Sequence, residues 1–147
     1  MASILKVDEL QGIVSAGDIT VTSEGGAATQ SLQQGLAKVW TNFSGISVSI
    51  RDSLNSASLT DSATGEFNVN YTNSMGNANY GVQVTSSYGG TDVGGADDSD
   101  YVNGIGTLRR TSGSTSTTAT KIITGSNVGI ATQDHAQSMV LAHGDLA

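Results

Sequence analysis

A run of acidic residues stands in the most glycine-rich part of the sequence and could gather around a metal ion. Asp97, Asp98 and Asp100 follow Gly94 and Gly95 in the segment SSYGGTDVGGADDSD. Ca²⁺ takes about six to eight oxygen ligands from a flexible loop. The spacing does not match an EF-hand, and it fits the calcium-binding nonapeptide only loosely and once. A solvated acidic loop is the more common arrangement, so calcium binding stays open and no cofactor or metal is predicted.

Two histidines, His135 and His143, are the candidates for acid–base chemistry. His135 has Asp134 as its immediate neighbour. A serine hydrolase also needs its serine on a G-x-S-x-G turn, and the segment GSNVG lacks that pattern. Serines are numerous in this chain, so a serine close to a histidine is expected by chance. We therefore predict that both histidines are structural.

Paired carboxylates are the other candidate set, because glycosidases hold two of them about 5 to 10 Å apart. Asp61 with Glu66, or Asp52 with Asp61, could be placed in this way. These residues occupy turn and strand-edge positions, where a solvated carboxylate is far more common. A glycan-degrading enzyme also needs more chain to build its groove. We therefore predict a protein that is not an enzyme and has no catalytic residues.

Composition and charge exclude several classes of partner and of binding site. The 147 residues carry a net charge of −7 with only six lysines and arginines, so no basic surface is available to neutralise phosphates and nucleic acid is not an expected partner. Zero cysteines exclude disulfides and thiolate zinc sites. Charges interrupt the first apolar residues, and no later run approaches about 18 apolar residues. We expect no Sec-type signal and no membrane span.

The elements that would position these residues show a period of two from residue 39 onward. Apolar residues alternate with polar ones in three runs, at Ile46, Val48 and Ile50, at Phe67, Val69 and Tyr71, and at Tyr80, Val82 and Val84. This alternation is typical of antiparallel strands with one buried and one solvated face, as in a sandwich or barrel. Further strands are predicted at residues 105–110, 118–124 and 138–143, with turns at 61–65 and 103–104.

The first 34 residues are predicted to form a separate N-terminal arm. Short strands are predicted at residues 4–10 and 19–22, flanking a turn at 16–18, and residues 27–38 are the only helix-like run. Gly35 weakens that helix by about 1 kcal/mol relative to alanine. An isolated hairpin is marginal in water, so the arm must dock on something.

The hydrophobic content predicts a thin core. Only 37% of the residues are hydrophobic and 5% are aromatic, while 19 are glycine. Burial yields about 25 cal/mol per Å², and ordering each backbone residue costs roughly 1 to 2 kcal/mol, so the chain gains from a partner that buries more area. We predict a homo-oligomer, with a marginal monomeric sandwich as the alternative.

A resemblance to a known family extends over residues 35–84. This run resembles a module of tail-fibre-like virion proteins from marine and cyanobacterial bacteriophages. The residues that carry the resemblance are Trp40, Asn42, Phe43, the IRDS run at 50–53, the LTD run at 59–61, Gly65, Glu66, Phe67, Val69, Tyr71 and the ANY run at 78–80. The opening SILKVDELQG and the closing VLAHGDLA are also similar to the ends of such chains, so the resemblance covers about half of the protein.

The resemblance implies a homotrimer in the virion, assembled in the host cytoplasm. Residues 1–34 would attach it to other tail or capsid proteins, and residues 35–147 would form an antiparallel, jelly-roll-like β-sandwich head. His143 departs from the family, which often has Phe there. The chain is also short for a long shaft, which favours a compact trimer.

The predicted function is a short tail-fibre-like or surface appendage that contacts a glycan or protein of the host. The contact site is predicted in the loops at Tyr88, Asp97, Asp98 and Asp100, because loops are least constrained by sheet pairing. The alternatives are a head fibre or capsid decoration protein, and a carbohydrate-binding β-sandwich module. The last would want exposed aromatic side chains, whereas Trp40, beside Phe43, is predicted to lie in the core.

Overall fold

The computed structural model describes residues 5–15, 19–87, 104–108, 114–126 and 132–147. The chain divides into two compact units, Met1–Leu36 and Ala37–Ala147. The predicted division between residues 34 and 35 falls inside the short helix near the end of the first unit. Each unit is described by itself below.

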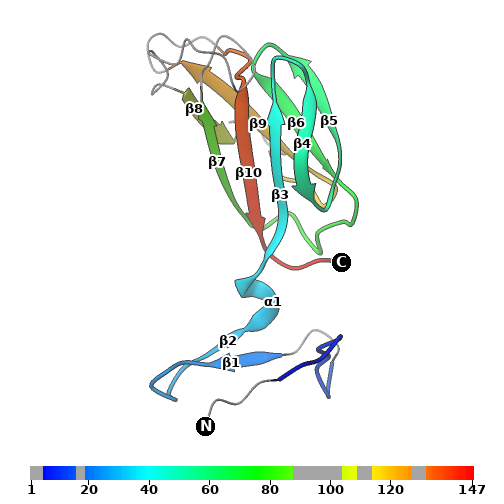
Figure 1. The fold of residues 1–147 in the computed structure, drawn as a ribbon, viewed down its shortest axis with the longest axis vertical. Helices are drawn as coiled ribbons and strands as arrows, with labels where there is room; N and C mark the ends of the chain where they lie inside the picture. The colour runs from blue at the N-terminus through cyan, green and yellow to red at the C-terminus, as the bar shows by residue number, and fades with distance from the viewer. Residues whose placement is uncertain (1–4, 16–18, 88–103, 109–113, 127–131) are drawn as a thin grey trace. The chain divides into compact units, whose positions relative to one another are not determined.

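The second unit, called the head from here on, contains two antiparallel sheets of four strands each among the described residues, which confirms the all-β prediction. Its strands are β3 (Ala37–Ser44), β4 (Ser49–Leu54), β5 (Ser56–Ala63), β6 (Glu66–Tyr71), β7 (Gly81–Ser87), β8 (Gly104–Leu108), β9 (Ala119–Ser126) and β10 (Gln137–His143). One sheet has the order β4-β3-β10-β7 and the other the order β5-β6-β9-β8 (Figure 1). The first and last strands of the head, β3 and β10, are therefore neighbours.

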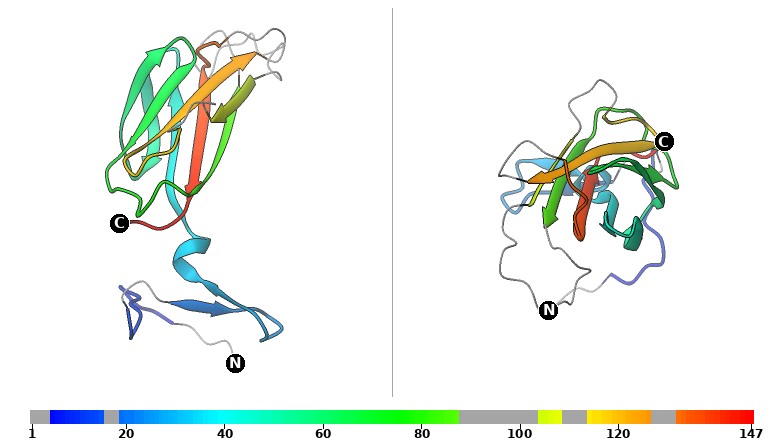
Figure 2. Two further views of the ribbon diagram at one scale, coloured as in Figure 1. Left: turned by 180° about the vertical axis from the view of Figure 1, so that it is seen from behind. Right: turned by 90° about the horizontal axis from the view of Figure 1, so that it is seen from above.

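The hydrophobic core lies between these two sheets, which are seen from both sides in Figures 1 and 2. The β4-β3-β10-β7 sheet contributes Val39, Phe43 and Val140, and the opposite sheet contributes Phe67 and Ile122, all 0 to 1% exposed. The rings of Phe43 and Phe67 meet edge to face with centroids 5.4 Å apart. Such a pair adds about 0.5–1.5 kcal/mol to the burial of its area, so the two rings help to hold the sheets together.

One end of the core is polar and fully hydrogen-bonded through two tyrosines. Tyr71 donates to the hydroxyl of Tyr80 at 3.0 Å, and Tyr80 Oη lies 2.9 Å from the carbonyl of Ser116, to which it can donate. Thr120 also bonds both phenolic oxygens. Burial raises the pKa of Tyr71 well above its ordinary value, so its hydroxyl stays protonated and remains a donor.

The first unit has a hairpin and a single helical turn. Strand β1 (Thr20–Thr22) pairs with β2 (Thr29–Ser31), and α1 (Leu32–Gly35) follows directly. The side chain of Ser31 caps this turn by accepting from the backbone N–H of Gln34 at 3.4 Å. None of the described residues of this unit is buried.

Three local predictions need correction. Only Leu32–Gly35 is helical within the predicted helix at 27–38, because its flanks pair as strands: β2 with β1 and β3 with β10. Residues 5–10 of the predicted first strand are not in a sheet, and β1 takes β2 as its partner. The alternating residues Ile46 and Val48 are 48% and 38% exposed in a turn, where Val48 has φ of 48°, and β4 begins only at Ser49.

Candidate functional site

The solvent-facing side of the β4-β3-β10-β7 sheet, called the outer face, carries a row of large side chains across four strands. Trp40 pairs with Leu54 on one side and with Leu141 on the other, and Leu141 pairs in turn with Gln83. Leu54 is 46% exposed, while Trp40 and Leu141 are half-buried. The next row on this face consists of Asp52, Asn42, Met139 and Thr85. Both rows follow from the alternation of side chains along each strand.

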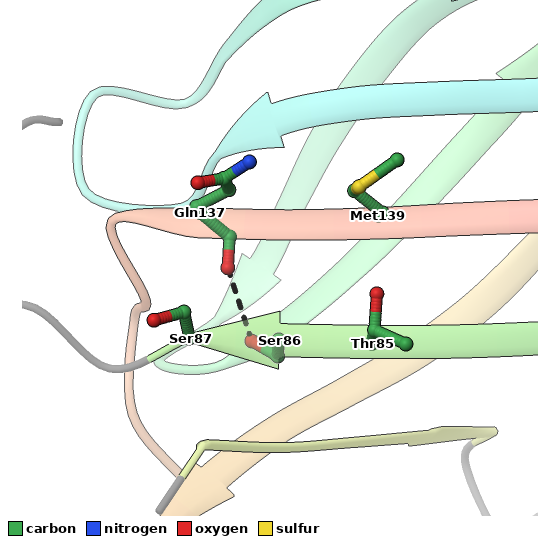
Figure 3. Close-up of a pocket in the computed structure, with 5 residues that line it drawn as sticks. All are labelled: Thr85, Ser86, Ser87, Gln137 and Met139. Carbon is green, nitrogen blue, oxygen red and sulfur yellow. Dashed lines mark hydrogen bonds between the residues drawn. The ribbon is translucent and has the colours of Figure 1, made fainter. Parts of the chain in front are cut away.

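Two shallow depressions lie next to one another on the outer face. The first has a volume of about 280 Å³ and is lined by Trp40, Gln83, Thr85, Met139, Val140 and Leu141. The second, of about 260 Å³, shares Thr85 and Met139 with it and extends to Ser86, Ser87 and Gln137 (Figure 3). Small-molecule sites span about 300–1,000 Å³, so the first depression would hold a small ligand or one unit of a longer one.

Asn42 adds a polar group to this face. Its Oδ1 atom is buried and has no hydrogen-bond partner in the part of the chain that the structure describes. An acceptor left in that state costs about 1–3 kcal/mol. Asn42 pairs with Met139, but it does not line the first depression and its Oδ1 atom is buried, so a molecule bound there would not reach this acceptor.

A buried serine–histidine cluster lies beneath the outer face. Ser86 Oγ forms a hydrogen bond with His135 Nδ1 and lies 2.9 Å from Ser138 Oγ. Asp134 Oδ1 accepts from the backbone N–H of Gly65 at 2.6 Å, and it is Ser86 that bonds His135 Nδ1, the nitrogen to which the acid of a hydrolase triad bonds. His135 is 0% exposed, which keeps a bound molecule away from its ring. The cluster ties the segment before β10 to β7 and β10.

Acid is expected to destabilise the head through His135. Burial lowers the pKa of His135 below its ordinary value of 6.5, and the charge of Asp134 opposes that shift only in part. Below about pH 6.5 this histidine is therefore protonated in the unfolded chain but still neutral in the folded chain. The free energy of unfolding consequently falls as the pH drops from 6.5 toward the lowered pKa. Urea unfolding between pH 8 and pH 5 measures this fall.

The control for this prediction is His135→Gln, which keeps a polar side chain of similar size but has no proton to take up. This variant is expected to lose the part of the pH dependence that lies just below pH 6.5. An identical fall in the variant and the natural protein would assign the pH dependence to carboxylates instead.

The other residues singled out in the sequence are spread over several strands. Asp52 in β4 and Asp61 in β5 belong to different sheets, whereas Asp61 and Glu66 lie on the paired strands β5 and β6, with Asp61 opposite Phe67 and Glu66 opposite Ala63. His143 ends β10, at the opposite end of that strand from His135. Tyr88, Asp97, Asp98 and Asp100, with Gly94 and Gly95, lie outside the described residues. Within the described ranges, no group of three or more His, Cys, Asp or Glu side chains could hold a metal ion.

The position of Trp40 was predicted wrongly, and the sequence contained a signal that Trp40 and Phe43 do not share one face of the strand. Trp40 and Phe43 are three residues apart, and positions an odd number apart on a strand face opposite ways. Val39, Thr41 and Phe43 are buried at 0% exposure, so Trp40 belongs to the outer face.

Comparisons with known proteins assign no family. No protein-family model matches the sequence, and neither the curated proteins nor the solved structures contain a match. Among the described residues, no helix is both long enough and apolar enough to cross a membrane.

Proposed function

We propose that this chain is a non-enzymatic structural protein of a bacteriophage virion, a short homotrimeric appendage with an exposed head. In this proposal residues 1–34 attach it to other tail or capsid proteins, and the jelly-roll-like head contacts a glycan or protein of the host. A capsid decoration or head fibre is the alternative location. The source of the proposal is the sequence resemblance, and the observation that supports it best is the exposed apolar surface of the first unit.

Large apolar side chains of that unit are open to solvent. Their exposed fractions are 76% for Leu5, 51% for Val7, 56% for Leu10, 104% for Ile13, 92% for Val14, 50% for Val21 and 54% for Leu36. Burying one such side chain completely yields about 1.5–3 kcal/mol. Several of them together would stabilise attachment to a partner, whereas the hairpin of three residue pairs in this unit, which contains only Val21 of these residues, has no interior of its own.

The head suits repeated copies. A trimer presents any contact site three times, and several trimers on one particle convert weak contacts into firm attachment. Such avidity requires neither a deep pocket nor chemistry, and the depressions described on the outer face are shallow. A rigid sheet scaffold with shallow sites is consistent with a virion component that assembles into several copies and contacts the host surface.

Making the arm polar is expected to abolish attachment and leave the head folded. The double variant Leu10→Asp and Ile13→Asp places two charges on residues that are 56% and 104% exposed, so it should not disturb folding. The measurement is immunogold electron microscopy of virions with an antibody against the head, together with light scattering of the purified protein. The natural chain should label particles and have three times the 14.9 kDa chain mass.

Ile46→Asp is the matched control, because Ile46 is 48% exposed in a turn of the head. It should label virions as the natural protein does. Virions that never label would contradict the location, and a monomer at high concentration would contradict the trimer. Full labelling by the arm variant would show that attachment uses another surface.

A carbohydrate-binding module is the second candidate, and one observation favours it. The lone Trp40 is on the outer face instead of in the core, so the head has an aromatic side chain available for a sugar.

A further inference from the structure

The depression beside Trp40 combines two kinds of group that together suit a sugar. Trp40 supplies an aromatic surface, against which the apolar C–H side of a pyranose ring can pack. Gln83 and Thr85 line the same depression and offer donors and acceptors for hydroxyl groups.

The remaining lining is apolar, which restricts the kind of sugar. Met139 is 44% exposed. Leu141 is two residues further along β10, and it pairs with Trp40 of β3. Figure 3 shows Met139 and Thr85 standing on the same side of the sheet, on neighbouring strands. A hexose with hydroxyl groups at every position would leave Met139 and Leu141 facing polar groups. A sugar with a methyl group, in an acetamido substituent or as a 6-deoxy carbon, would cover them.

Charge selects against anionic sugars. The chain has a net charge of −7, and the carboxylate of Asp52 is exposed on the outer face opposite Asn42. A sulfated or carboxylated glycan would approach a surface of its own sign, which lowers both the association rate and the affinity.

We infer that the outer face around Trp40 binds a neutral, methyl-bearing sugar, an N-acetylhexosamine or a 6-deoxyhexose. Trp40 packs on the ring, Gln83 and Thr85 form hydrogen bonds with its hydroxyl groups, and Met139 with Leu141 covers the methyl group. This inference rests on the proposed host contact for its biological setting, and it places that contact on the sheet instead of in the predicted loops. A second copy of the chain is the competing occupant of an apolar sheet face, and the experiment below separates the two.

Because Trp40 is the only tryptophan, its fluorescence reports on the site directly in the full-length chain. Titration with N-acetylglucosamine, N-acetylgalactosamine and fucose should give a saturable change with dissociation constants of about 1 mM, typical of a single shallow contact. Glucose and galactose, which lack the methyl group, should bind about fourfold more weakly, the worth of one buried methyl group. Sialic acid should not bind measurably.

Two variants test the named contacts by saturation-transfer NMR, which does not depend on the tryptophan signal. Trp40→Ala should weaken binding at least about tenfold. Gln83→Leu should also weaken it about tenfold, yet it should not destabilise the head, because Gln83 lines the depression and its side chain is exposed. Ile46→Ala, in the turn before β4, is the control and should bind as the natural protein does.

The inference would be overturned by the lack of a saturable signal with every methyl-bearing sugar at about 50 mM, well above the expected constants. It would also be overturned if Trp40→Ala or Gln83→Leu changed the mass measured by light scattering, because a copy of the chain would then cover the face. These outcomes can be distinguished from failure of the proposed function. Sugar binding by a protein that is absent from virions would support this inference and contradict the virion location. Labelled virions without sugar binding would support the virion location and contradict this inference.

Discussion

Replacing Phe67 with alanine is expected to lower the free energy of unfolding of the head by about 3–5 kcal/mol. Phe67 is 1% exposed and meets Phe43 edge to face across the core, with the ring centroids 5.4 Å apart. Alanine would remove most of the buried area and leave a cavity that two paired sheets close only in part. Urea unfolding followed by the fluorescence of Trp40 measures the change.

Small domains are typically stable by about 5–15 kcal/mol, so Phe67→Ala could leave little folded protein. Phe67→Leu keeps most of the volume and is expected to cost less than about 1.5 kcal/mol, which gives a measurable intermediate. Ile46→Ala, at a side chain that is 48% exposed, is the matched control and should change stability by less than about 0.5 kcal/mol. A loss for Phe67→Ala no larger than that of the control would mean that the two sheets do not share this core.

Gly65→Ala is expected to cost about 2–5 kcal/mol, although it adds only one methyl group. Gly65 is the second residue of the β5–β6 turn and has φ of 69°, where a side chain costs about 1–2 kcal/mol. A Cβ atom there would also lie 2.5 Å from both Gln133 N and Thr124 O, which are backbone atoms that cannot rotate away. Overpacking of this kind typically adds about 1–3 kcal/mol. The midpoint of urea unfolding measures the total.

Two further substitutions separate the causes. Gly81→Ala in β7 places its Cβ atom at an ordinary 3.9 Å from His143 O, and should change stability by less than about 1 kcal/mol. Gly65→Asn tolerates the left-handed backbone but adds the same Cβ atom, so it should keep most of the loss. Natural stability in Gly65→Asn would show that the backbone conformation, and not the contact with Gln133, explains the cost.

The contact site that we propose lies on a sheet, whereas the sequence predicted it in loops. Tyr88, Asp97, Asp98 and Asp100 lie outside the described residues, so their role stays a prediction. The outer face around Trp40 offers a rigid alternative in which β-strand pairing sets the spacing of the side chains. Positions set by a sheet are better defined than positions in a loop, which favours a recognition surface there.

The strand pattern of the head was largely readable from the sequence. Alternation at Phe67, Val69 and Tyr71 predicted β6, and residues 118–124 and 138–143 predicted most of β9 and β10. The β5–β6 hairpin was also predicted, with a turn that the structure confines to Thr64 and Gly65. These features depend on side-chain period and turn residues within a few positions, which a sequence contains in full.

Tertiary structure alone decided which face each strand buries and which strands are neighbours. Strand β10 lies between β3 and β7, so Leu141 meets Trp40, about 100 positions away in the sequence. Ile46 and Val48 continue the strand alternation but occupy a turn, and His135 is enclosed by residues remote from it. A period of two divides a strand into two sets of side chains, but both sets are equivalent until a second sheet covers one of them. The packing of one sheet on the other depends on contacts between residues far apart in the sequence. It determined that Phe43 and Phe67 form the core while Trp40 remains at the surface.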